Sequence, residues 1–106
     1  MIVGQFHTGS GIGNQLFRYV ATRVLAKDKS YEWGMLNAQN WKGKDWMHLD
    51  CPTAIKQWDK EYKEKEVRDE NGVDIRPYDP EINFVEDNTI IEGEFQDPRY
   101  FMHRID

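Results

Sequence analysis

A chain of 106 residues, with 39% hydrophobic and 31% charged side chains, lies near the lower size limit for a domain with its own core. Its net charge of −5 is uneven: residues 1–50 carry six Lys and Arg against four Asp and Glu, and residues 51–106 carry eight against fifteen. The acidic second half argues against nucleic acid or an anionic membrane as partner, because both require a basic surface. We expect one domain over residues 1–106.

Cysteine content and the first residues bear on the compartment. Cys51 is the single cysteine, so an internal disulfide cannot form and a reducing compartment is expected. Residues 1–6 lack the basic flank and long apolar region of a signal peptide. No segment approaches transmembrane length. The sequence therefore predicts a soluble, cytoplasmic protein.

The first elements form a strand–helix–strand pattern. Residues 1–7 are apolar enough for a buried strand, and small residues follow it. Residues 14–28 are predicted to be a helix, capped by Asn14 or Gly13 and ending in a basic turn. Its apolar face comprises Leu16, Phe17, Val20, Ala21, Val24 and Leu25. Residues 30–35 are predicted to form a second strand, which would give the opening unit of a parallel α/β sheet.

The middle of the chain is less regular. Residues 36–58 favour short helices and loops, and the interleaved charges of residues 59–70 favour a solvated helix or an exposed strand. A three-residue loop over residues 70–72 would pair Val67 with Ile75 and Asp69 with Val73, with Gly72 in the left-handed position. We expect an exposed hairpin there, ended by Pro77.

The last elements complete the predicted fold. Residues 89–95 are apolar and β-branched enough for a buried strand. Pro98 suits the first turn of a helix, with Asp97 as its cap. The predicted class is α/β: a Rossmann-like partial parallel sheet with flanking helices, plus an exposed β-hairpin.

A glycine-rich turn precedes the first helix. Gly9, Gly11 and Gly13 alternate there, and unpaired N–H groups at a helix N-terminus attract anions such as a sugar diphosphate. A P-loop is excluded because no Lys follows Gly13. A dinucleotide fingerprint fits better, with Glu32 as ribose partner, although Asn14 occupies the place of its last glycine. Spacing alone leaves a structural turn and an anion site open.

Two stretches carry a family resemblance. Residues 10–19 read Ser-Gly-Ile-Gly-Asn-Gln-Leu-Phe-Arg-Tyr and residues 91–101 read Ile-Glu-Gly-Glu-Phe-Gln-Asp-Pro-Arg-Tyr-Phe. The first resembles the Gly-Gly-Leu-Gly-Asn-Gln-Leu/Met-Phe-Gln-Tyr signature of the family 11 glycosyltransferases, the α-1,2-fucosyltransferases. The second is similar to that family's Gly-Tyr-Phe/Trp-Gln-Ser-x-x-Tyr-Phe stretch. The two stretches follow each other in the family's order.

The resemblance implies a fold, a reaction and a set of site residues. It implies the N-terminal half of a GT-B-type fold with two Rossmann-like halves, and inverting transfer of fucose from GDP-fucose to a galactose hydroxyl without an essential metal or cofactor. The N-terminal half mostly serves the acceptor, and its glycine-rich loop reaches the donor cleft. The implied substrate-binding residues are Gly11, Gly13, Asn14 and Gln15, with Gln96 from the second stretch. Gly93, Phe95, Tyr100 and Phe101 are implied to be structural.

This sequence also departs from the family. Its members are longer and carry a downstream His-x-Arg-x-x-Asp stretch that grips GDP-fucose. The residues from His103 to Asp106 have those letters at a different spacing. We therefore expect a truncated domain, without the nucleotide-binding half, that is not catalytically complete alone. Its expected partners are a sugar nucleotide or a glycan, a second half in trans, or another copy of the chain.

Other readings remain open beside this one. His7 ends the first strand beside the glycine-rich turn, so its imidazole is a candidate for substrate binding, with a packing role as the alternative. His48 and Cys51 form no convincing metal site, so no metal is expected. The four tryptophans suit core packing, or the surface of a non-catalytic binding or assembly module. A small nucleotide-binding protein that uses Glu32 is a third reading.

Overall fold

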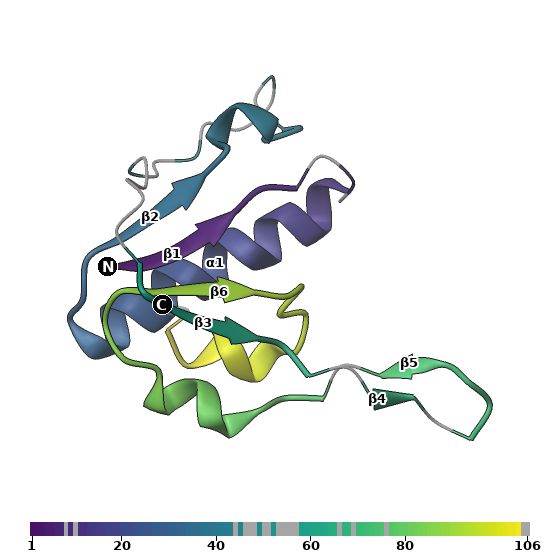
Figure 1. Cartoon of the computed structure of the whole chain (residues 1–106). Coiled ribbons are helices and arrows are strands. Elements are labelled where there is room, and N and C mark those ends of the chain that lie inside the picture. Colours follow the sequence, from purple (N-terminus) through teal and green to yellow (C-terminus); the bar gives the residue numbers. More distant parts are fainter. Residues whose placement is uncertain are drawn as a thin grey trace.

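The fold is built on a parallel sheet of four strands. The computed structural model describes residues 1–7, 9, 11–43, 45, 49, 52, 58–65, 67–68, 70–75 and 77–104. The strands lie in the order β2 (Trp33–Leu36), β1 (Ile2–Gln5), β6 (Thr89–Glu92) and β3 (Lys60–Lys63), and each neighbouring pair is parallel (Figure 1). The predicted α/β class with a partial parallel sheet is confirmed.

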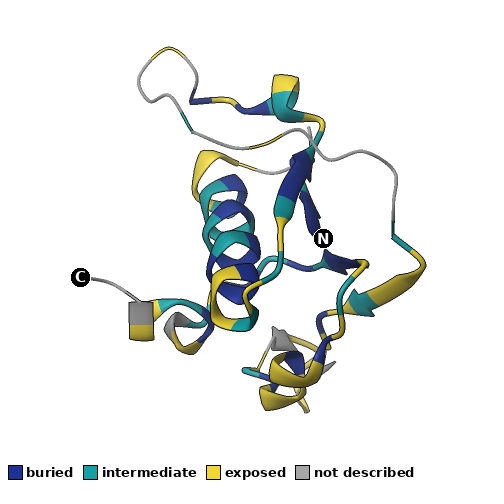
Figure 2. Ribbon diagram, turned by 90° about the vertical axis from the view of Figure 1, so that its left-hand side faces the viewer, coloured by how far each residue is buried: buried dark blue, intermediate teal, exposed yellow. Residues whose placement is uncertain are grey.

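One α-helix covers one face of the sheet. Helix α1 (Ile12–Lys29) connects β1 to β2 and lies to one side of the strands (Figure 2). It is the one α-helix in the described part of the chain, whereas flanking helices were predicted; the other described helical segments are short 3₁₀ turns. These include η1 (Ala38–Asn40) and η2 (Pro80–Phe84).

Helix α1 begins earlier than predicted. Its N-cap is Gly11, in an extended conformation, so the predicted caps Asn14 and Gly13 are wrong: both lie inside the first turn. The left-handed Ser30 ends the helix, and Lys27 and Lys29 lie in its last turn as expected. The helix start therefore has no side-chain cap and no acidic residue in its first turn.

The buried face of α1 differs from the predicted apolar stripe. Ala21, Val24 and Leu25 are buried as expected, but the polar Gln15 and Thr22 are fully buried as well. Leu16, Phe17 and Val20 are only half-buried. The hydrophobic pattern misplaced the buried face because it leaves out polar residues. Gln15 and Thr22 can be buried because their side chains donate hydrogen bonds to nearby backbone carbonyls.

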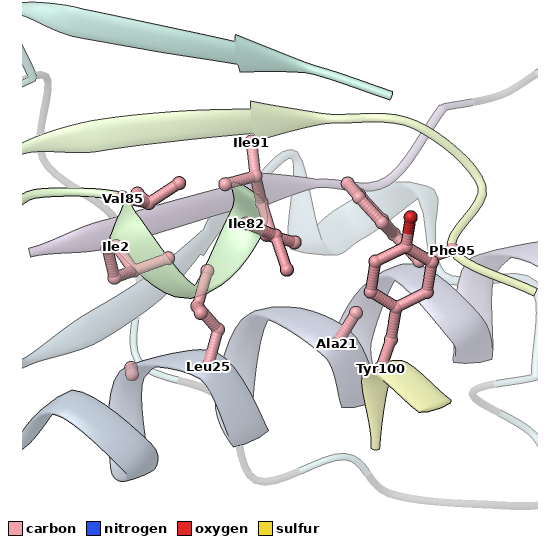
Figure 3. Close-up of a cluster of buried hydrophobic side chains, with 9 residues drawn as sticks. Ile2, Ala21, Leu25, Ile82, Val85, Ile91, Phe95 and Tyr100 are labelled. Carbon is pink, nitrogen blue, oxygen red and sulfur yellow. The ribbon is translucent and has the colours of Figure 1, made fainter. Parts of the chain in front are cut away.

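The main core lies between the sheet and α1. Figure 3 shows it as side chains from β1, β6, α1 and the segments on either side of β6. Ring contacts extend it: Phe95 and Tyr100 meet edge to face with centroids 5.3 Å apart. Its buried members are Ile2, Ala21, Leu25, Ala26, Ile82, Val85, Ile91, Phe95 and Tyr100.

The charged segment after residue 58 is an exposed strand, one of the two predicted alternatives. Strand β3 exposes Lys60, Glu61 and Lys63, and it occupies one edge of the sheet. Charged side chains on an edge strand disfavour pairing with another chain. The exposed charges of β3 therefore keep this edge of the sheet solvated.

The predicted hairpin is present. Strands β4 (Val67–Arg68) and β5 (Asp74–Ile75) pair antiparallel with Val67 opposite Ile75, and Gly72 has a φ of 78°. The expected Asp69–Val73 pair lies outside the described residues because it includes Asp69. The hairpin projects from the body of the domain (Figure 1).

The segment after β6 forms two short 3₁₀ turns in place of the predicted helix. These are η3 (Pro98–Tyr100) and η4 (Met102–Arg104). Asp97 accepts a hydrogen bond from the backbone N–H of Arg99, as a cap would. Tyr100 is buried against Phe95, so tertiary packing holds the short turn in place. Among the described residues, no helix is long and apolar enough to cross a membrane.

Asp79 joins three parts of the fold. Its buried carboxylate accepts hydrogen bonds from the Tyr62 hydroxyl at 2.8 Å and from the Glu81 backbone N–H at 3.1 Å. Its own N–H donates to the Tyr100 hydroxyl at 3.0 Å. Burial acts to raise the pKa of Asp79, but the hydrogen bonds from Tyr62 and Glu81 to its carboxylate and the nearby Lys65 ammonium outweigh burial and lower the pKa below its ordinary value.

This lowered pKa predicts an acid-sensitive contact. A carboxylate whose pKa is lower in the folded state stabilises the fold above its unfolded pKa, and the stabilisation is lost as the pH falls through the folded value. Urea denaturation should therefore show wild type more stable than Asp79→Asn at pH 7, with the difference shrinking below about pH 4. Asp87 and Asp97 also have lowered pKa values. Wild type and Asp79→Asn both retain these two aspartates, so their contribution cancels in the difference between the two proteins. A difference that stays constant from pH 7 to pH 2 would contradict the prediction.

Candidate functional site

The candidate site lies at the carboxyl edge of the sheet. The glycine-rich turn leaves the end of β1 toward α1, and the loop of residues 93–97 leaves the end of the neighbouring strand β6. Ligands of open α/β sheets bind beyond the carboxyl ends of the strands. The two stretches that carry the family resemblance therefore begin at adjacent points of this edge.

A hydrogen bond joins the two stretches. The Gln96 side-chain amide donates to Asn14 Oδ1 at 2.6 Å, across 82 positions of the sequence. The same amide lies 3.2 Å from a carboxylate oxygen of Glu94. Gln96 is exposed and Asn14 is half-buried, so a ligand can reach both. Two predicted substrate-binding residues are thus brought together.

Gln15 is held by the protein backbone. Its side chain is fully buried, and its amide nitrogen donates to the carbonyl oxygens of His7 at 3.1 Å and Asn40 at 2.8 Å. Its oxygen accepts from the Lys42 N–H at 2.9 Å. A ligand contact to Gln15 would have to displace one of these bonds. The residue holds the glycine-rich turn against the segment after β2.

The two glycines of the site face open space. Gly11 and Gly13 are exposed, and a Cβ added at either one would have nothing within 4 Å. Because no side chain caps α1, its first N–H groups remain open at the carboxyl edge of the sheet, close to Asn14. The helix dipole places partial positive charge there, which favours an anionic group.

The loop after β6 is strained and fixed by a buried carboxylate that sequence reasoning missed. Gly93 has a φ of 155° and Phe95 a φ of 51°, which is unusual for an aromatic residue. Glu64, 7% exposed, accepts from the N–H groups of Glu94 at 3.0 Å and Phe95 at 3.2 Å. Glu64 therefore sets the path of the chain into Gln96.

An apolar groove adjoins the Asn14 side of the edge. It has a volume of about 280 Å³ and is lined by the half-buried stripe of α1 and by Phe101. Phe17 and Phe101 tilt against each other with ring centroids 5.8 Å apart. An aromatic surface beside polar groups suits the mixed polar and apolar surface of a sugar ring.

His7 belongs to a separate polar cluster with Gln5 and Glu92. The Gln5 side-chain amide donates to Glu92 Oε1 at 2.8 Å and lies 2.9 Å from His7 Nε2. His7 Nε2 is 3.5 Å from Glu92 Oε2. Sequence reasoning proposed His7 but missed Gln5 and Glu92. The two-residue spacing of Gln5 and His7 could have indicated that both side chains lie on one face of the sheet. Their proximity to Glu92 depends on the register between β1 and β6, which a single sequence does not reveal.

The ribose partner expected for a dinucleotide site is in the wrong place. Glu32 precedes β2, so it lies at the amino edge of the parallel sheet, opposite the glycine-rich turn. His103 is at that same edge, where it contacts Asp28 near the end of α1. Neither residue takes part in the candidate site. Glu32 is therefore not placed to contact a ribose bound at the glycine-rich turn, as a small nucleotide-binding protein that uses Glu32 would require.

The other candidate groups contribute little to the site. The described residues contain no group of three His, Cys, Asp or Glu side chains that could hold a metal ion. His48 and Cys51 lie outside the described residues. Trp41 is buried, and Trp33 and Trp58 are half-buried, which fits core packing.

No protein-family model, curated protein or solved structure matches this chain. The candidate site is therefore defined by its own residues: the exposed glycines and Asn14 at the start of α1, and Gln96 in the strained loop after β6.

Proposed function

We propose that this domain is a fucosyltransferase-like unit that meets the sugar diphosphate of a GDP-fucose donor at the carboxyl edge of its sheet. The observation that carries the proposal is the Gln96–Asn14 hydrogen bond, because it unites the two stretches that resemble the family 11 glycosyltransferases. A parallel sheet with a helix between its first two strands supports the Rossmann-like half that the resemblance implies.

The chemistry of the edge supports a diphosphate ligand. Transfer of fucose breaks the bond between the anomeric carbon and a phosphate oxygen, and negative charge builds on the departing diphosphate. The N–H groups at the uncapped start of α1 and the side-chain nitrogen of Asn14, whose oxygen already accepts from Gln96, are suited to bind such oxygens. Complete transfer requires a donor-binding half, which the resemblance places in a second Rossmann-like unit.

Calorimetric titration of the 106-residue protein with GDP-fucose tests the proposal, with GDP and NAD as comparison ligands. We expect micromolar to millimolar binding of GDP-fucose that Asn14→Ala weakens about tenfold, the equivalent of about 1.4 kcal/mol. The melting temperature should change little because Asn14 is half-buried and is not the helix cap. NAD should bind more weakly because Glu32 lies at the opposite edge of the sheet.

Matched variants separate the site from general surface effects. Asn83→Ala, in the exposed segment η2, should bind GDP-fucose like wild type. Gln96→Ala should weaken binding as Asn14→Ala does, and the double variant should lose less than the sum of both, since the two side chains share one hydrogen bond. Absence of GDP-fucose binding, or equal binding by wild type and Asn14→Ala, would overturn the proposal.

A further inference from the structure

The Gln5–His7–Glu92 cluster lies on the face of the sheet that α1 does not cover. Ile2 and Phe6 of the first strand segment pack in the clusters beneath α1, so Gln5 and His7, which alternate with them, point to the opposite face. Val3 pairs in register with Ile90, and two residues further along these parallel strands Gln5 meets Glu92. The cluster thus sits at the carboxyl ends of the two central strands.

The hydrogen bonds within the cluster fix which atoms can meet a ligand. The Gln5 amide nitrogen reaches both Glu92 Oε1 and His7 Nε2, which leaves the Gln5 oxygen, the His7 Nδ1–H and Glu92 Oε2 available. Lys63, beside Glu92 on β3, places its ammonium 3.3 Å from Glu61. The His7 and Glu92 side chains are 43% and 28% exposed, so solvent reaches both.

These groups favour one chemical class of ligand. A carboxylate in the centre disfavours an anion. A metal ion is disfavoured because the cluster holds one carboxylate and its imidazole Nε2 accepts from Gln5. Neighbouring donors and acceptors suit hydroxyl groups, each of which both donates and accepts. We propose that Gln5, His7 and Glu92 form a binding site for the adjacent hydroxyls of a neutral sugar.

This inference rests on the proposed function for its role: the bound sugar is the acceptor, held at the same edge as the donor diphosphate. The binding itself is measured separately from donor binding. Methyl β-galactoside is the probe, and tetrahydropyran, the same ring without hydroxyls, is the control compound. The full chain is followed by NMR, which reports on the Gln5 side-chain amide and the His7 ring.

We expect methyl β-galactoside to shift the Gln5 and His7 signals in a saturable way, and tetrahydropyran to leave them unchanged. Glu92→Gln keeps the shape of this half-buried side chain but removes its charge, and it should weaken galactoside binding about tenfold or more. His7→Gln should have a similar effect. Glu86→Gln is the matched control because Glu86 is an exposed carboxylate before β6. The same spectra show whether each variant is folded.

The two proposals fail in different ways. Two results would overturn the sugar site, whatever the outcome with GDP-fucose. One is that methyl β-galactoside causes no shift of the Gln5 and His7 signals in wild type. The other is that a folded Glu92→Gln variant binds the galactoside like wild type. Loss of GDP-fucose binding with intact galactoside binding would overturn only the donor proposal. We expect Glu92→Gln to keep wild-type affinity for GDP-fucose, since Asn14 and Gln96 are unchanged in it.

Discussion

Replacing Gln15 with leucine is expected to lower the free energy of unfolding by about 3 kcal/mol. The variant keeps a buried side chain of similar size but leaves the carbonyl oxygens of His7 and Asn40 and the Lys42 N–H without their partner. Each backbone group buried without a hydrogen bond costs about 1–3 kcal/mol, and the added apolar burial of leucine offsets part of that. Urea denaturation monitored by tryptophan fluorescence measures the difference.

Gln39→Leu is the matched control for this variant. Gln39 is exposed in η1, so the same substitution there should change stability by less than about 0.5 kcal/mol. A Gln15→Leu variant that loses less than about 1 kcal/mol of stability and no longer binds GDP-fucose would place Gln15 in direct contact with ligand. We expect the opposite pattern: a larger loss of stability, with GDP-fucose binding retained by the folded variant. The reason is that the Gln15 side-chain amide is already hydrogen-bonded to backbone groups.

Local patterns were sufficient to predict most elements. The strand before the glycine-rich turn, α1, β2, the hairpin and β6 each follow from a pattern within about twenty residues. Gly72 illustrates this, because a left-handed position in a three-residue loop fixes the pairing of Val67 with Ile75. The helix start was misplaced because Gly11 carries no side chain to mark it as the cap.

The candidate site was only half predictable, because half of it depends on pairing between distant strands. The family resemblance suggested Asn14 and Gln96, but their hydrogen bond follows from the placement of β6 beside β1. Glu92 meets Gln5 for the same reason, and Glu64 reaches the loop after β6 because β3 pairs with β6. A single sequence does not reveal strand order or register, since many pairings satisfy the same alternation.

The strained loop after β6 connects stability with the site. Phe95 adopts a left-handed backbone while its ring fills the core against Tyr100. Such a conformation persists only where surrounding contacts hold it, and here the Glu64 carboxylate binds two successive N–H groups. The buried Phe95 and Glu64 thereby position Gln96 next to Asn14, so buried residues orient the exposed part of the site.

Gly4→Ala is expected to destabilise the domain by about 2–3 kcal/mol, because no space exists for a methyl group between β1 and α1. A Cβ at Gly4 would lie 2.2 Å from Thr22 Oγ1 and 2.9 Å from the Met35 sulfur. The strand and the helix would have to separate, and both lead into the glycine-rich turn of the candidate site. Thermal or urea denaturation measures the loss.

Two further variants decide whether the Thr22 contact is the cause. Gly13→Ala adds the same methyl group within α1, where nothing lies within 4 Å, and should leave stability unchanged or raise it by up to about 1 kcal/mol. Gly4→Ala combined with Thr22→Ala removes the clashing oxygen, so the double variant should be more stable than the sum of the two single losses. Strict additivity would show that the methyl group and Thr22 do not compete for the same space. The close approach of β1 to α1 would then not be what requires a glycine at position 4.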